Sequence, residues 1–306
     1  HDKFFKETFS DKSTAIDFFK QTFPADLSNN INFATLDFDQ NSYIDEELKE
    51  YFSDIVYNCI YKSDTSLKIA LLFEHKSFVP EYPHLQLFKY LLKIWEANLK
   101  QDKKLIPVIP IIFYHGKERW EIIPFCNYFK GIDETLKHFI PGINYLLTDL
   151  SSFSDEELMN GIFNNITTKI SSLLMKNIFD EEKLLQNLVD FLNIGALYFK
   201  EEKGLKFLEA VIRYILSNIN EFGIETVKKA VEQISVEGVK TVMTIAESLI
   251  QKGKIEGIKE GEEKGKIEGK IEAAKNLLHI LDDETISKTL SIPLDQVKQL
   301  RQNDTL

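Results

Sequence analysis

The sequence predicts an α/β (α+β) protein in which helices cover both sides of a sheet, followed by an all-helical C-terminal half. Two apolar runs, 51–61 and 67–76, are rich in Ile, Val, Tyr and Phe and flank the turn residues Ser63–Ser66, which is typical of a β-hairpin. Both faces of these runs are largely apolar, which indicates a sheet covered on two sides. Beyond Ser151 the apolar residues follow a helical period almost throughout.

Alternation along the hairpin brings acidic and basic side chains to one face of the sheet. That face carries Asp54, Val56, Asn58 and Ile60 from the first strand and Lys68, Ala70, Leu72, Glu74 and Lys76 from the second. A loop centred on Asp64 would put Asp54 and Glu74 directly opposite each other, with Cβ atoms about 5 Å apart. Two carboxylates so close require a shared proton, the Lys76 ammonium or a bound divalent metal.

A metal at this position would supply hydrolytic chemistry. One or two carboxylates completed by waters suit Mg²⁺. Such an ion polarises a phosphoryl oxygen and lowers the pKa of a bound water, and the Lys76 ammonium would orient or deprotonate that water. The three side chains therefore indicate phosphodiester hydrolysis.

The order of these residues resembles a known superfamily. Asp54 followed by Glu74-His75-Lys76 on the next strand is similar to the D…(D/E)-x-K pattern of PD-(D/E)XK nucleases, although Ser53 stands where that pattern has Pro. Asp2–Lys6, Tyr51–Asp54, Leu72–Ser77 and Phe113–Gly116 resemble its recombination-promoting nuclease and transposase family, over about residues 1–150. The resemblance implies a restriction-endonuclease-like core that acts on DNA. It also implies a Mg²⁺ or Mn²⁺ cofactor held by Asp54, Glu74 and the backbone carbonyl of His75, with Lys76 as the catalytic amine.

The flanking helices offer auxiliary residues. Residues 84–100 predict a helix whose sheet-facing side is Leu85, Phe88, Leu92, Trp95 and Leu99. Gln86 and Tyr90 form a Q-x-x-x-Y pattern that resembles RecB-like members of the superfamily, which implies a place near the metal and the DNA backbone. A helix before the hairpin often contributes an acid in the superfamily, so Asp2 and Glu7 are candidates; the alternative is a solvated helix face.

Composition limits the partners. Thirty-seven Lys and Arg against 48 Asp and Glu give a net charge of −11, which argues against a protein that coats nucleic acid non-specifically. A local positive face would still admit DNA, from Lys62, Lys89, Lys93, Lys100, Lys103 and Lys104. The two cysteines have no metal-type spacing, the N-terminal residues lack the apolar segment of a signal peptide, and no apolar run reaches 18 residues. We therefore expect a cytoplasmic protein without a membrane partner.

We expect three stretches: a nuclease-like core at 1–150, a helical region at 151–250 and a tail at 251–306. In the tail, glycines recur at 253, 257, 261, 265 and 269. This repeat predicts either a helix that packs closely in a homo-oligomer or a linker. Residues 283–297 resemble a helix-turn-helix, whose second helix would offer Gln296, Lys298, Gln299 and Arg301 to DNA or to a protein.

These observations predict a Mg²⁺-dependent DNA endonuclease associated with recombination or transposition. The alternative is a catalytically silent nuclease fold that binds DNA or a protein. A third reading takes the same fold as an RNase. The sequence does not choose between DNA and RNA, because no residue is recognisable as a reader of the 2′-hydroxyl.

Overall fold

A computed structural model of the chain describes residues 1–41, 43–44, 48–50, 52–74 and 78–304. The chain forms two compact units, His1–Ile245 and Ala246–Leu306. The finer division at residues 150 and 250 stays a prediction. In the described ranges, no helix combines the length and the apolar character that crossing a membrane requires.

The first unit is built on one mixed sheet of five strands in the order β1-β2-β3-β4-β5. The strands are β1 (Ile31–Asp39), β2 (Phe52–Tyr61), β3 (Thr65–Glu74), β4 (Val108–Tyr114) and β5 (Leu146–Asp149). β1, β2 and β3 pair antiparallel, whereas β3, β4 and β5 pair parallel. β2 and β3 are the predicted hairpin, and the α+β class is confirmed.

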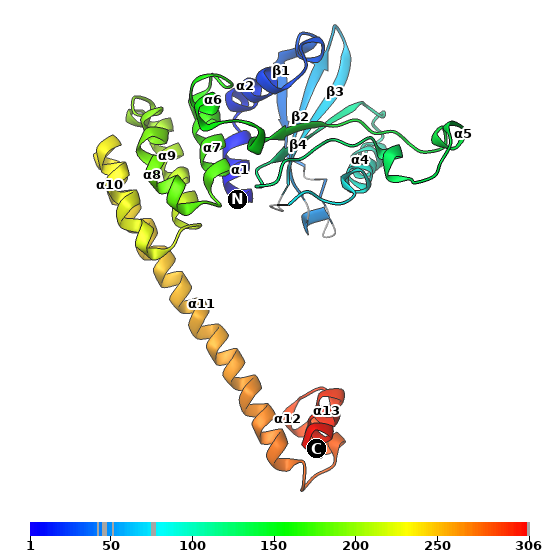
Figure 1. The fold of residues 1–306 in the computed structure, drawn as a ribbon, viewed down its shortest axis with the longest axis vertical. Coiled ribbons are helices and arrows are strands. Elements are labelled where there is room, and N and C mark those ends of the chain that lie inside the picture. Colours follow the sequence, from blue (N-terminus) through cyan, green and yellow to red (C-terminus); the bar gives the residue numbers. More distant parts are fainter. Residues whose placement is uncertain (42, 45–47, 51, 75–77, 305–306) are drawn as a thin grey trace. The chain divides into compact units, whose positions relative to one another are not determined.

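One face of the sheet is covered by the N-terminal helices α1 (Asp2–Phe9) and α2 (Lys12–Thr22), against which α7 (Ile166–Asn177) packs (Figure 1). The Phe5 ring stacks on Phe73 of β3 with centroids 4.7 Å apart. The buried Tyr57 hydroxyl of β2 donates to the Phe9 carbonyl at the end of α1. The side chain of Asp11 caps α2 by accepting from the Thr14 N–H.

The opposite face is covered by α4 (Pro83–Lys100), the helix of the crossover that joins the parallel strands β3 and β4 (Figure 1). Val56, Ala70 and Leu72 of the sheet share a buried cluster with Leu87 and Tyr90 of α4. The sheet is therefore covered on both sides, as its two apolar faces predicted.

The predicted buried stripe of α4 was wrong. Leu85, Leu92 and Leu99 are 49%, 54% and 56% exposed, whereas the buried positions are His84, Leu87, Tyr90, Leu91, Ile94 and Asn98. The buried stripe contains polar side chains, whereas the stripe beside it is more apolar. A prediction based on hydrophobicity alone therefore chose the wrong stripe. Polar residues under a helix that faces the sheet are themselves a sign of a site.

The remaining helices of the first unit are α3 (Ala25–Ser28), α5 (Glu134–Lys137), α6 (Asp155–Asn160), α8 (Glu181–Asn193), α9 (Glu202–Leu216) and α10 (Ile224–Ile234). Ser154 and Glu157 form a capping box at the start of α6. Gly204 of α9 lies so close to the preceding turn that a Cβ would come 1.8 Å from the Tyr198 carbonyl oxygen. Only glycine allows that approach.

The second unit contains most of α11 (Val236–Leu277), together with α12 (Asp283–Leu290) and α13 (Leu294–Asp304). The glycine repeat is helical, because α11 runs through it without a break. Ala274, Leu278, Ile286, Ile292 and Val297 form the small core of this unit. Arg301, which the sequence offered to a partner, instead binds Asp283 and the carbonyls of Leu278 and Leu281.

Candidate active site

The two hairpin acids lie on one face of the sheet, but in a different register from the predicted one. Asp54 pairs with Leu72, and Glu74 pairs with Phe52. The connection is therefore centred on Ser63 rather than Asp64, with Lys62 at a φ of 54° in the left-handed region. Moving the centre by one residue displaces each partner by two, so the acids remain on one face as diagonal neighbours, with roughly 7 Å between them.

Asp54 is held by two donors from different parts of the chain. Its Oδ2 accepts the backbone N–H of Tyr43 at 2.9 Å and the hydroxyl of Tyr90 at 3.1 Å. The residue is only 7% exposed. Burial first, and then the Asp54 charge, raise the pKa of Tyr90 well above its ordinary value, so this hydroxyl remains a proton donor. α4 thus brings the predicted auxiliary residue Tyr90 to the predicted acid Asp54.

Glu74 ends β3 and is fully buried. Its charge contributes to raising the pKa of Tyr114 to about 12, after burial and the charges of Asp149 and Glu118. Asp149 ends β5, two strands away, and its carboxylate accepts the N–H groups of Trp120 and Ser151. The carboxyl ends of the parallel strands therefore concentrate negative charge, which favours a cation there.

Gln86 lies one helical turn before Tyr90 on α4. Its Oε1 is buried, and no hydrogen bond is made to it in the part of the chain that the structure describes. A buried carbonyl oxygen without a donor carries a desolvation cost. Gln86 is therefore suited to hold a ligand or to accept from one.

Two catalytic predictions fall outside the described residues: the side chain of Lys76 and the backbone carbonyl of His75. The candidate acids of α1 lie elsewhere, since this helix packs against the face that carries Phe73. Glu7 pairs with Arg213 at 2.9 Å, and Asp2 pairs with Lys6 at 3.5 Å. Both acids therefore form ion pairs within the helical layer on that face of the sheet.

His115 follows β4 and is buried among aromatic rings. It stacks on Phe73 with centroids 4.9 Å apart and on Phe179 at the same separation.

Tyr43 is the residue of the site that the sequence did not predict. Its contribution is a backbone N–H, which binds Asp54, and a backbone donor cannot be recognised from residue type. The Tyr43 N–H reaches Asp54 because of the path that the chain takes between β1 and β2.

The donor set around Asp54 and Glu74 fits a divalent cation. Two buried carboxylates on one face are hard oxygen ligands of the type that Mg²⁺ takes, and a cation between them would balance their charge. Among the described residues, no three His, Cys, Asp or Glu side chains lie close enough together to share an ion. The fit therefore concerns a two-carboxylate site.

The fold and the site together define an α+β protein with a candidate metal site, in which Asp54 and Glu74 are buried on the side of a mixed sheet that α4 covers. Residues 1–221 match the family described as "Putative transposase, YhgA-like", and the chain belongs to that family. The family predicted from the hairpin is thus confirmed.

Three relatives from Escherichia coli extend this finding. Recombination-promoting nuclease RpnA of strain K12 is 25% identical over 257 residues, which cover 83% of this chain and 84% of the relative. Recombination-promoting nuclease RpnD of O157:H7 is 25% identical over 256 residues, covering 81% and 93%. Inactive recombination-promoting nuclease-like protein RpnE of strain K12 is 26% identical over 266 residues, covering 85% of each chain. No solved structure matches the chain.

Proposed function

We propose that this protein is a metal-dependent endodeoxyribonuclease with a PD-(D/E)XK core, acting in recombination or transposition of DNA. The observation that carries the proposal is the placement of Asp54 and Glu74, which are buried on one face of adjacent strands. Two relatives named as recombination-promoting nucleases, each matched over more than four fifths of this chain, support the same reaction.

Each residue has a distinct part in the proposed site. Asp54 and Glu74 hold Mg²⁺ or Mn²⁺, with the His75 carbonyl as a further ligand. The bound ion would polarise the phosphoryl oxygen of the scissile phosphodiester. Tyr43 and Tyr90 both donate to Oδ2 of Asp54, which fixes the plane of that carboxylate. Lys76 orients or deprotonates the attacking water and stabilises the charge that develops on the phosphate. Gln86 accepts a hydrogen bond from a ligand.

The second candidate is a nuclease fold that binds DNA or a protein without turnover. The observation that favours it is the relative RpnE, which is named inactive although it matches 85% of this chain. The net charge of −11 points the same way, because tight non-specific DNA binding depends on clustered positive charge.

Cleavage of supercoiled plasmid in Mg²⁺ or Mn²⁺ tests the first candidate against the second. The variants are Asp54→Asn and Lys76→Ala, with Asp37→Asn as the matched control, since Asp37 is an exposed acid on β1 of the same sheet. We expect wild type and the control to nick the plasmid, and both site variants to be slower by roughly 100-fold or more. Cutting at the wild-type rate in both site variants would show that the site is wrong. A wild type that binds DNA without cutting it in either metal would establish the silent module.

A further inference from the structure

A polar cavity lies on the same face of the sheet as Asp54, toward the other end of the strands. Its volume is about 560 Å³, within the range of small-molecule sites. β1, β2 and β3 form its floor, and the end of α4 and the segment after it form its wall. The residues that line it include Asp39, Asn58, Lys68, Asn98, Lys103 and Lys104.

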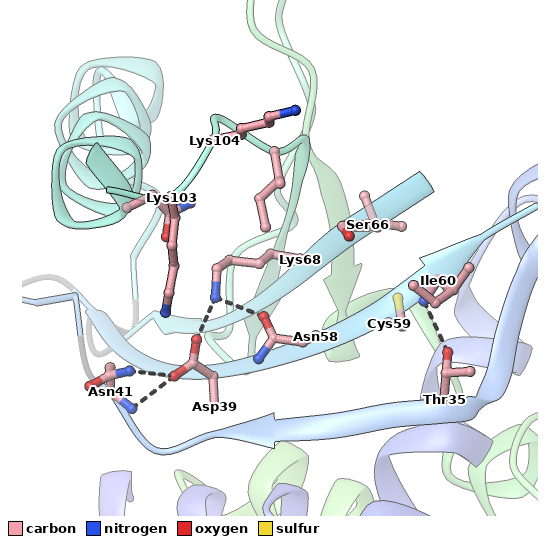
Figure 2. A pocket seen from close by; sticks show the side chains of 13 residues that line it. Thr35, Asp39, Asn41, Asn58, Cys59, Ile60, Ser66, Lys68, Lys103 and Lys104 are labelled. Carbon is pink, nitrogen blue, oxygen red and sulfur yellow. Dashed lines mark hydrogen bonds and ion pairs between the residues drawn. The ribbon is translucent and has the colours of Figure 1, made fainter. Parts of the chain in front are cut away.

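The floor of this cavity is a buried ion pair. Lys68 Nζ pairs with Asp39 Oδ2 and donates to Asn58 Oδ1 at 2.8 Å, and Asn41 also donates to Asp39 (Figure 2). Burial raises the pKa of Asp39, but the hydrogen bonds from Lys68 and Asn41 outweigh it and lower the pKa to about 2. Asp39 is therefore ionised at neutral pH, and the pair contributes no net charge.

The wall is positively charged and has an unused donor. Lys103 points toward Asp39 and Lys68 in Figure 2, and in the described part of the chain neither Lys103 nor Lys104 has an ion-pair partner. Asn98 is only 4% exposed, and its Nδ2 makes no hydrogen bond to the described residues. A buried amide without an acceptor carries a desolvation cost, which a ligand oxygen would recover. The cavity thus presents donors and positive charge in a protein whose net charge is −11.

We propose that this cavity binds the phosphate group of a nucleotide unit. Lysine ammonium groups bind phosphate as point charges, and the volume accommodates a base and sugar beside the phosphate. Asn58 is four residues along β2 from Asp54, about 13 Å away. Tyr43 connects the candidate metal site and the cavity, because its N–H binds Asp54 and its hydroxyl donates to Asp39 at 2.9 Å. The phosphate comes either from a free nucleotide or from a nucleic-acid strand that also reaches Asp54.

Binding measured in EDTA tests this site without requiring hydrolysis, so its failure is distinct from a failure of the proposed nuclease activity. The probes are thymidine 5′-monophosphate, followed by calorimetry, and a fluorescent single strand of ten thymidines, followed by anisotropy. The variants are Lys103→Gln and Asn98→Leu in the full chain. Lys229→Gln is the matched control, since Lys229 is an exposed lysine of α10 that does not line the cavity.

We expect Lys103→Gln and Asn98→Leu each to weaken binding of at least one probe by roughly tenfold, and Lys229→Gln to leave it unchanged. Asn98→Leu should also melt no lower than wild type, because it removes a buried donor that has no partner. An effect confined to the mononucleotide identifies a free nucleotide. A backbone phosphate is identified if the variants weaken binding of the strand and if Lys103→Gln makes the slope of log K against log salt concentration shallower by about 0.7. The proposal is overturned if neither probe binds the wild type, or if both variants bind as the wild type does.

Discussion

The hydrogen bond between Tyr90 and Asp54 can be removed with little other change. Tyr90→Phe deletes one oxygen from a fully buried ring and keeps the packing of that ring against Leu72 and Leu87 in the same cluster. Asp54 retains the N–H of Tyr43 as a donor. The loss is therefore that of one hydrogen bond to a charged acceptor, which contributes about 1.5–3 kcal/mol.

We expect Tyr90→Phe to lower the free energy of unfolding of the first unit by about 2 kcal/mol, or the melting temperature by about 4–8 °C. Urea denaturation followed by tryptophan fluorescence measures this unit selectively. Both tryptophans of the chain, Trp95 and Trp120, lie in it, and Trp120 is buried in the same cluster as Tyr90. The same variant should bind Mn²⁺ roughly tenfold to a hundredfold more weakly, because a partner that orients a metal ligand is lost.

Tyr145→Phe is the matched control. Tyr145 belongs to the same cluster, and its hydroxyl accepts a neutral and longer hydrogen bond, 3.3 Å from Trp120 Nε1. We expect it to cost about 1 kcal/mol or less and to leave Mn²⁺ binding unchanged. The reasoning is refuted if Tyr90→Phe is as stable as the wild type and binds Mn²⁺ equally well, or if Tyr90→Phe and Tyr145→Phe weaken Mn²⁺ binding by the same factor.

Three further outcomes are expected. The low pKa of Asp39, about 2 against an ordinary 3.8, means that its stabilisation is complete above about pH 4 and is lost as the pH falls toward 2. Urea titrations should thus show wild type losing roughly 2 kcal/mol over this interval through one carboxyl, and Asp39→Asn should lack that component; parallel pH profiles would disprove it. Arg301→Gln removes the bonds to Asp283 and Leu281, so hydrogen exchange in α12 and α13 of the full chain should accelerate by roughly tenfold, and unchanged exchange would contradict this. A Cβ at Gly265 or Gly269 would meet nothing within 4 Å in its own chain, so alanine at both should stabilise α11. If the glycine repeat packs closely in a homo-oligomer rather than acting as a linker, the same change should weaken that oligomer, and sedimentation that shows an unchanged mass would rule out close packing there.

Local sequence patterns were sufficient for most of the first unit. Residues 84–100 were predicted as a helix and form α4 (Pro83–Lys100), because apolar residues recur there at helical spacing. The faces of β2 and β3 also followed from alternation, because every second residue of a covered strand must match its surroundings.

The remaining features depend on contacts distant in sequence. The centre of the hairpin turn moved by one residue because Lys62 adopts a left-handed conformation, which residue type does not announce for lysine. The buried stripe of α4 was missed because it contains the polar residues His84, Tyr90 and Asn98. His84 packs among aromatic rings, Tyr90 donates to Asp54, and Asn98 lines the polar cavity. The Tyr43 N–H and the Lys68–Asp39 pair likewise bring together residues eleven or more positions apart.

The central claim is that Asp54 and Glu74 together hold a divalent ion, and calorimetry with Mn²⁺ tests it most directly. The account predicts one site in the wild type that disappears in both Asp54→Asn and Glu74→Gln and persists in the surface control Asp37→Asn. Binding that is undiminished in Asp54→Asn and Glu74→Gln would contradict the account, as would a wild type that binds no Mn²⁺.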